Sequence, residues 1–167
     1  MFNEMFPVHH HSTQHLESQD LAAMATYLLG DTPPTAKAVQ HVPYPQLSES
    51  SKRGRQQYLN VCTGRAGMEG EGKPHIAVAM QGNTTLRLSD TRNLLRVVVD
   101  GIGEQQCGGF ERMQPMPGFA EKLDDAQLTD LLNYLRQSWG GLPGDLDVQA
   151  VSQLKSDGVP AHAGKAM

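Results

Sequence analysis

Apolar residues recur every three or four positions in several segments of the chain, and this spacing predicts amphipathic helices. The long helices expected from it cover residues 19–29, 49–62, 90–100 and 125–139. A further short helix is expected within 142–155. Every element that the pattern indicates is helical, so we expect an all-α fold.

Residues that commonly start and stop helices lie at the ends of these segments. Ser18 and Asp124 are suited to cap the first and the last long helix with their side-chain oxygens. Gly30 follows the first helix and Gly101 follows the third, as is usual beyond a helix C-terminus. Gly54 lies inside the second helix, where glycine costs about 1 kcal/mol relative to alanine, so we expect a packing reason for it.

Proline and glycine are concentrated between the helices. Residues 32–47 contain four prolines and little periodicity, which indicates a linker. Long loops are expected at 63–88 and 102–118. The chain of 167 residues has 17 Gly, 10 Pro and a hydrophobic content of 38%, which suits a modest core with long loops around a cofactor.

Several classes of function are disfavoured. A net charge of -4 argues against nucleic-acid binding, and no apolar run approaches the length of a membrane span. The glycine-rich stretch 67–72 is not followed by the Gly-Lys-Ser/Thr of a phosphate-binding loop. No Ser/His/Asp set or Cys/His pair can be placed, so no catalytic residue is predicted and we do not expect an enzyme.

The stretch that carries recognisable chemistry is 62–67, Cys-Thr-Gly-Arg-Ala-Gly. A c-type haem motif, Cys-x-x-Cys-His, needs two thiols to bond the vinyl groups and a histidine to hold the iron. Cys62 supplies the first thiol. Arg65 stands where the second thiol belongs, and Ala66 stands where the histidine belongs.

From about residue 45 to residue 140, the chain resembles the third cytochrome c domain of the multi-haem cytochrome subunit of membrane-bound bacterial alcohol, sorbitol and gluconate dehydrogenases. The residues that carry the resemblance are the frame at 62–67, Gly54, Tyr58, the Met-Pro-Gly-Phe sequence at 116–119, and the closing helix with Leu128, Leu131, Leu135 and Trp139. The segments 12–16 and 22–29 resemble the end of the preceding domain of the same family, with Met5 near the place of its axial methionine.

The resemblance implies a domain organisation. Residues 1–31 would be a remnant of the preceding cytochrome-like domain with one helix, and 32–47 a linker. Residues 48–141 would be a cytochrome c-like domain, in which the C-terminal helix crosses the second helix closely at Gly54. Residues 142–167 would form a C-terminal extension, mobile from about 156 onward.

The resemblance also implies a cofactor site. Haem c would be bonded through Cys62 and ligated axially by Met116, with Met113 as a nearby second choice. A methionine before proline is also an ordinary packing residue of a loop. His75 is the histidine nearest the site, and it is a weak candidate for a substitute iron ligand.

Two functions follow from the altered motif. In the first, the domain has kept the scaffold, holds no haem, and has a structural or docking role. In the alternative, it is a haem c carrier that passes single electrons from a dehydrogenase to the respiratory chain with non-standard ligation. The resemblance implies a quinoprotein or flavoprotein dehydrogenase subunit as the partner.

Two features remain outside this picture. The run His9 to His11, with His15, could suggest a metal site. Three consecutive side chains do not converge easily on one ion, so we expect no metal site there. The two thiols, Cys62 and Cys107, are expected to be free, and a disulfide remains the alternative if the chain is exported.

The start of the chain bears on localisation. Its first residues lack the basic start, apolar middle and cleavage site of a secretory signal. The chain would be cytoplasmic if Met1 is the true start, whereas the family resemblance implies the periplasm.

Overall fold

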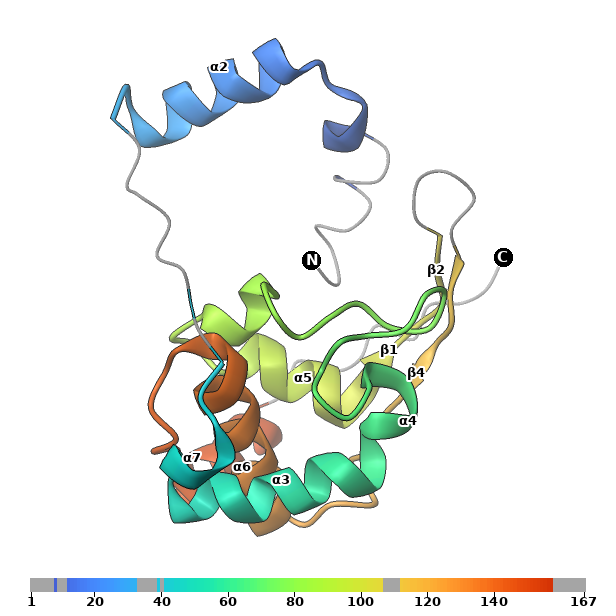
Figure 1. Ribbon diagram of the computed structural model, residues 1–167, viewed down its shortest axis with the longest axis vertical. Helices are drawn as coiled ribbons and strands as arrows, with labels where there is room; N and C mark the ends of the chain where they lie inside the picture. The colour runs from blue at the N-terminus through green and yellow to red at the C-terminus, as the bar shows by residue number, and fades with distance from the viewer. Residues whose placement is uncertain (1–7, 9–11, 33–38, 40, 107–111, 158–167) are drawn as a thin grey trace. The chain divides into compact units, whose positions relative to one another are not determined.

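A computed structural model describes residues 8, 12–32, 39, 41–106 and 112–157 (Figure 1). The chain divides into two compact units, Met1–Ala38 with Gln106–Glu111 and Val39–Gln105 with Arg112–Met167. The predictions for Met5, His9 to His11, Cys107 and the tail from 158 lie outside the described residues. Within the described ranges the structure is predominantly helical, which confirms the predicted fold class.

The first unit contains the helix α2 (Ser18–Leu29), which follows a 3-10 turn, η1 (Thr13–His15). The helix begins one residue earlier than predicted, because Glu17 rather than Ser18 has the extended backbone of a cap residue. Gly30 ends it with φ of 80°, as its position predicted. No residue of α2 is buried, and Tyr27 is 89% exposed.

The second unit holds the remaining described helices, which are α3 (Glu49–Val61), α4 (Thr63–Ala66), α5 (Arg92–Asp100), α6 (Asp125–Leu135) and α7 (Val148–Ser156). Single helical turns lie at η2 (Tyr44–Gln46), η3 (Thr84–Arg87) and η5 (Arg136–Gly140), the last of which is π-helical. The long helices lie where the apolar spacing predicted them. The short helix α4 and the change to a π turn after Leu135 were not anticipated.

The N-terminus of α6 is fixed by a reciprocal pair of hydrogen bonds. The Asp124 carboxylate accepts from the Gln127 N–H at 2.8 Å, and the Gln127 side chain accepts from the Asp124 N–H at 3.1 Å. This capping box satisfies two N–H groups that a helix start would leave unpaired, and it confirms Asp124 as the predicted cap. The helix and its π turn end before Gly141, which has φ of 68°.

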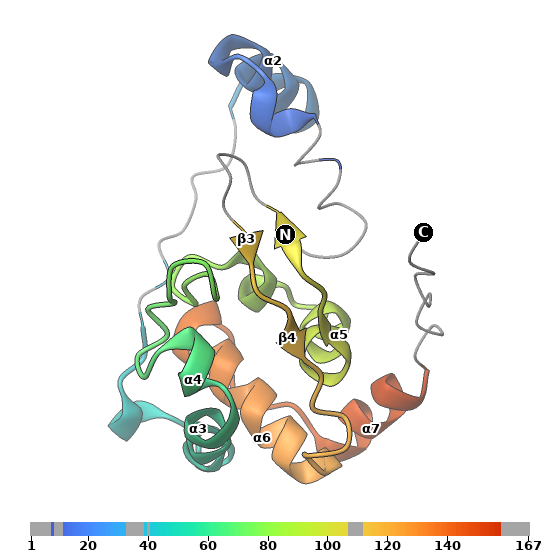
Figure 2. The same cartoon turned by 90° about the vertical axis from the view of Figure 1, so that its right-hand side faces the viewer.

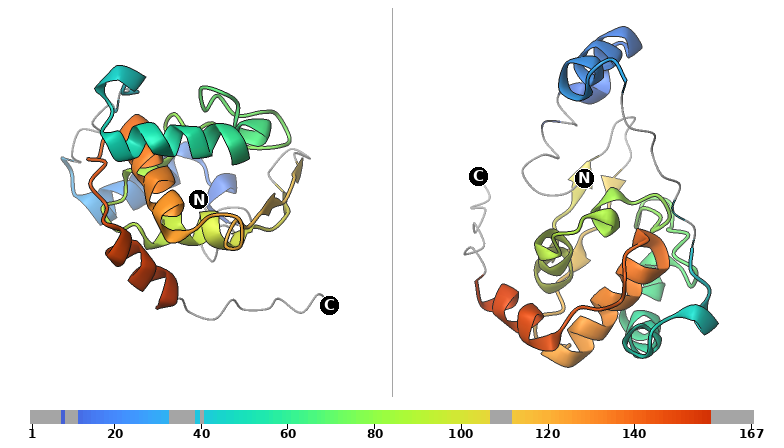
Figure 3. Two further views of the ribbon diagram at one scale, coloured as in Figure 1. Left: turned by 90° about the horizontal axis from the view of Figure 1, so that it is seen from below. Right: turned by 90° about the vertical axis from the view of Figure 1, so that its left-hand side faces the viewer.

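Helices α3 and α6 cross at close range, as the teal and orange ribbons in the left view of Figure 3 show. A Cβ atom at Gly54 would overlap the backbone carbonyl oxygen of Asp130, and it would lie 2.9 Å from the Cβ of Tyr134. This is the packing reason expected for a glycine in the middle of α3. A larger residue there would push the two helices apart.

An aromatic group fills the crossing. The ring centroids of Tyr58 and Tyr134 are 5.4 Å apart, and that of Trp139 lies 5.4 Å from Tyr58 and 5.2 Å from Tyr134. All three side chains are at most 4% exposed. Tilted and edge-on rings at these separations stabilise a core beyond the area they bury.

Helix α7 packs across α5 and α6, as Figure 2 shows. Val151 is 1% exposed, and the Lys155 ammonium lies 2.8 Å from the Asp125 carboxylate at the start of α6. The C-terminal helix therefore closes one side of the core. None of the helices in the described ranges is both long and apolar enough to cross a bilayer.

Short strands occur where the sequence predicted only loop. They are β1 (Gly101–Ile102), β2 (Gln105–Gln106), β3 (Arg112–Met113) and β4 (Met116–Pro117). Strands β1 and β4 are antiparallel, and Ile102 lies opposite Met116. Two-residue strands carry no alternating pattern long enough to be recognised in a sequence.

Candidate functional site

The stretch 62–67, compared above with a haem motif, lies at the end of α3 and on α4. Cys62 ends α3, where its N–H donates to the Tyr58 carbonyl at 2.9 Å, and its own carbonyl accepts from the first turn of α4. The Ala66 N–H donates to that carbonyl at 2.9 Å. Backbone hydrogen bonds of the helical type thus hold residues 62–67.

Cys62 is half-buried and packs against the main apolar core. Burial raises the pKa of its thiol to about 12, because an apolar surrounding disfavours the charged thiolate. A thiol with so high a pKa is neutral at physiological pH, and a neutral thiol is a poor nucleophile and a poor metal ligand.

Ala66 is 4% exposed and belongs to the core cluster. The next residue, Gly67, has φ of 84°, and its carbonyl accepts from the buried Tyr58 hydroxyl at 2.6 Å. The Gly72 N–H donates back to the Ala66 carbonyl at 2.8 Å. The methyl group of Ala66 is thus enclosed by protein, at the position where the motif would place an imidazole.

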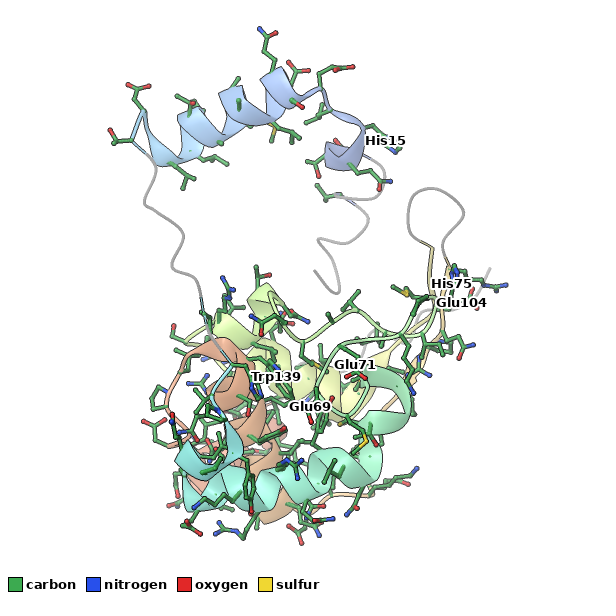
Figure 4. All side chains as sticks on the ribbon, viewed as in Figure 1. His15, Glu69, Glu71, His75, Glu104 and Trp139 are labelled. Atoms are coloured by element: carbon green, nitrogen blue, oxygen red, sulfur yellow. The ribbon has the colours of Figure 1, made fainter. Side chains whose placement is uncertain are left out.

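The glycine-rich turn after Ala66 folds around a carboxylate. The Glu71 carboxylate accepts from the Glu69 N–H at 2.9 Å. Hydrogen bonds from the backbone of Glu71, Glu69 and Met68 lower the pKa of Glu71 below its usual value. Gly67 has φ of 84°, a backbone conformation that favours glycine, so the turn is suited to glycine there. Both glutamates are labelled in Figure 4.

Arg65 is turned toward two neighbouring loop segments. Its Nη2 donates to the Ile76 carbonyl at 3.1 Å and to the Gln114 carbonyl at 2.8 Å. No sequence pattern indicates these contacts, because any residue type can present a backbone carbonyl. The guanidinium therefore has acceptors of its own in the structure.

Met116 and Met113 lie on strands rather than in open loop. Met116 belongs to β4, opposite Ile102, and its partly buried side chain packs against the core that contains Ala66. Met113 lies on β3 and is partly buried. The structure thus brings Cys62 and Met116 to the same apolar cluster.

His75 lies elsewhere. It is exposed, its φ is 59°, and its backbone carbonyl accepts from the Gln114 N–H at 3.2 Å. It is labelled in Figure 4, where it lies among the loops, in contrast to Trp139 in the core. It does not belong to the core cluster against which Cys62 and Met116 pack.

The side chains at these positions can be compared with the needs of haem c. Two thioethers and a histidine ligand require two thiols and an imidazole, whereas positions 62, 65 and 66 supply one thiol, one guanidinium and one methyl group. Across the described part of the chain, no three His, Cys, Asp or Glu side chains are grouped as metal ligands. The residues present therefore do not fit a haem c bound through this motif with a histidine ligand.

Comparisons with known proteins define the family. The family model described as cytochrome c matches residues 51–139, which is more than half of the chain. The cytochrome c subunit of the quinone alcohol dehydrogenase of Gluconobacter oxydans is 27% identical over 167 residues, covering 96% of this chain and 35% of that protein. The cytochrome c subunit of gluconate 2-dehydrogenase of Pantoea cypripedii is 27% identical over 99% of this chain and 40% of that protein.

The chain thus spans between a third and two fifths of the length of these relatives. Among solved structures, the c-type cytochrome XoxG of Methylobacterium extorquens aligns at 20% identity with a TM-score of 0.40, covering 66% of this chain and 67% of that one. The family match begins within α3 and ends within the π turn that follows α6, so it includes Gly54 and the stretch 62–67. The chain belongs to the cytochrome c family.

Proposed function

We propose that this chain is a cytochrome c-fold domain of the dehydrogenase electron-transfer family that binds no haem and has a structural or docking role. The observation that carries the proposal is Ala66. An alanine buried in the core at the position that the motif gives to the iron-binding histidine offers no donor atom to iron.

The state of Cys62 supports this proposal. Cys62 is the one thiol among residues 62–67. One thiol without the second thiol and the histidine is an incomplete substrate for an attachment machinery that, in the family the chain resembles, reads these residues together.

Arg65 also supports the proposal that the domain binds no haem. A guanidinium is charged at every physiological pH. Burying it unpaired against an apolar macrocycle would cost on the order of several kcal/mol, as for any uncompensated buried charge. Here the guanidinium is hydrogen-bonded to two carbonyls instead.

The relatives suggest the setting. They are the cytochrome c subunits of an alcohol dehydrogenase and a gluconate dehydrogenase. We therefore propose a quinoprotein or flavoprotein dehydrogenase subunit as the partner and the periplasm as the location. In this proposal 48–141 is the docking domain, 1–31 is what remains of a preceding domain, 32–47 is the linker, and 142–167 is an extension.

The test is to mature the chain in bacteria that attach c-type haem, with a secretion leader added, and to measure the intact mass. The matched control carries Arg65→Cys together with Ala66→His, which restores the complete motif on the same scaffold. We expect the unaltered chain to keep its polypeptide mass of 18.2 kDa and the control to gain one haem. A gain of haem by the unaltered chain would overturn the proposal.

The alternative function has one observation in its favour. Cys62 and Met116 both pack against the same core cluster, so a single thioether and an axial methionine would start from one apolar region. An electron carrier of this kind needs a second iron ligand, and Met116→Leu would then change the colour and potential of the purified protein. A colourless unaltered protein excludes this alternative.

A further inference from the structure

Three segments that are distant in sequence meet at Arg65. The first is α4, which carries Arg65 itself. The second is the tight turn 73–77, closed by paired backbone bonds between Lys73 and Ala77 at 2.9 and 3.0 Å. The third is the segment 112–117, which carries β3 and β4 with Gln114 between them. Because β4 pairs with β1, we call these paired segments the Met116 hairpin.

Hydrogen bonds link each of these three segments to the other two. One nitrogen, Arg65 Nη2, directs its two hydrogens at Ile76 of the turn and Gln114 of the hairpin. The Gln114 N–H in turn donates to the His75 carbonyl at 3.2 Å. Gln114 is therefore held through both its carbonyl and its N–H, and it lies two residues before Met116.

We propose that Arg65 is a positioning residue that fastens the Met116 hairpin and the turn 73–77 onto α4. The proposal rests on the proposed function, because it assigns these bonds to a domain that holds no haem. Arg65, which stands where the motif has its second thiol, thus supplies a cross-link between α4, the turn and the hairpin.

The energetics favour such a role. A hydrogen bond from a charged donor contributes more than a neutral one, and two bonds from one planar group add geometric definition. Lys73 adds a second link, since its ammonium donates to the Gly64 carbonyl of α4 at 2.8 Å. Because the Arg65 bonds lie at the edge of the core, their effect should be local to the hairpin rather than global.

Amide hydrogen exchange of the full chain tests the proposal. In Arg65→Met, which keeps the aliphatic stem and loses every donor, we expect the Gln114 amide to exchange about tenfold faster or more. The Cys62 amide, bonded to the Tyr58 carbonyl within the α3 terminus, should exchange as in the unaltered chain. An unchanged rate at Gln114 would overturn the proposal.

A matched control separates the cross-link from general loosening of the hairpin. Arg112 lies on the same hairpin and forms an exposed ion pair with Glu104 at 2.6 Å. Exposed pairs stabilise little, so Arg112→Met should change the Gln114 rate by no more than about twofold. Equal acceleration in both variants would overturn the proposal.

A measurement on the unaltered chain covers the case in which Arg65→Met does not fold. Proton NMR should show cross-peaks between the Arg65 side chain and the backbone protons of Ile76 and Gln114, and their absence would overturn the proposal. Failure of the proposed function has a different signature, which is haem in the unaltered protein. The two results can therefore be told apart.

Discussion

The α3–α6 crossing and the region around Arg65 are held together by different kinds of interaction. At the crossing, Gly54 brings two backbones into contact, and three buried aromatic rings fill the space beside it. Around Arg65, short loop segments are joined by hydrogen bonds from side chains to backbone carbonyls. The contacts at the crossing are therefore mainly apolar, whereas those that join the segments around Arg65 are polar.

This difference shows how a cofactor-binding fold can change on one side only. The crossing constrains every residue involved, because a single methyl group at Gly54 would collide with the neighbouring helix. The loop region accepts new residue types, because a carbonyl acceptor remains available whatever the side chain. In our proposal the scaffold persisted through the crossing, and the haem side was rebuilt with polar bonds.

The largest effect is expected at the crossing. Gly54→Ala should destabilise the domain by about 3 kcal/mol or more, because the added methyl group meets the Asp130 carbonyl oxygen, which cannot move without separating the helices. Urea unfolding followed by circular dichroism measures it. A loss below about 1 kcal/mol would contradict the described crossing.

A glycine in the loop region supplies the control. Gly64 lies in α4, and a Cβ there meets nothing within 4 Å. Gly64→Ala should leave the free energy of unfolding unchanged or raise it by about 0.5–1 kcal/mol, because alanine restricts the unfolded chain.

A smaller effect is expected where the two regions meet. Tyr58→Phe removes the hydroxyl that donates to the Gly67 carbonyl at 2.6 Å and leaves that carbonyl without this partner. The loss should be about 1–2 kcal/mol in the free energy of unfolding. Burial also raises the pKa of the Tyr58 hydroxyl, so the unaltered protein should lose this contribution only at strongly alkaline pH. A neutral Tyr58→Phe substitution would show that the bond contributes nothing to joining the two regions.

The smallest effect concerns the Cys62 thiol. Its pKa is raised from 9.0 to about 12, so its contribution to stability is complete below pH 9 and is lost as the pH rises toward 12. With Cys107→Ser as background, the free energy of unfolding should fall by about 0.5 kcal/mol at pH 9, and Cys62→Ala should remove that dependence. A thiol that reacts with a disulfide reagent at the rate of a free cysteine would contradict the burial.

The sequence predicted the crossing far better than the loop region. Apolar spacing placed the long helices, and Gly54 and Asp124 were identified from rules that depend only on neighbouring residues or on one close contact. The strands β1 and β4 were missed because two residues carry no periodicity. The contacts of Arg65 were missed because their acceptors are backbone atoms from positions 11 and 49 residues away.

The candidate site residues also differ in how well the sequence predicted their positions. Cys62 and Met116 were named from the motif and the resemblance, and the structure places both against the core. Their role toward a cofactor stays a prediction. His75 was a candidate only because it is a histidine near the motif in sequence, and its exposed position with φ of 59° is set by the loop path, which no local pattern specifies.

The most direct test of the account is the visible absorption spectrum of the purified unaltered chain, produced where c-type haem is made and attached. We predict a colourless protein without a Soret band, while the variant with Arg65→Cys and Ala66→His, prepared in parallel, is red. A Soret band in the unaltered protein, carried by a porphyrin that its own side chains ligate, would contradict the account.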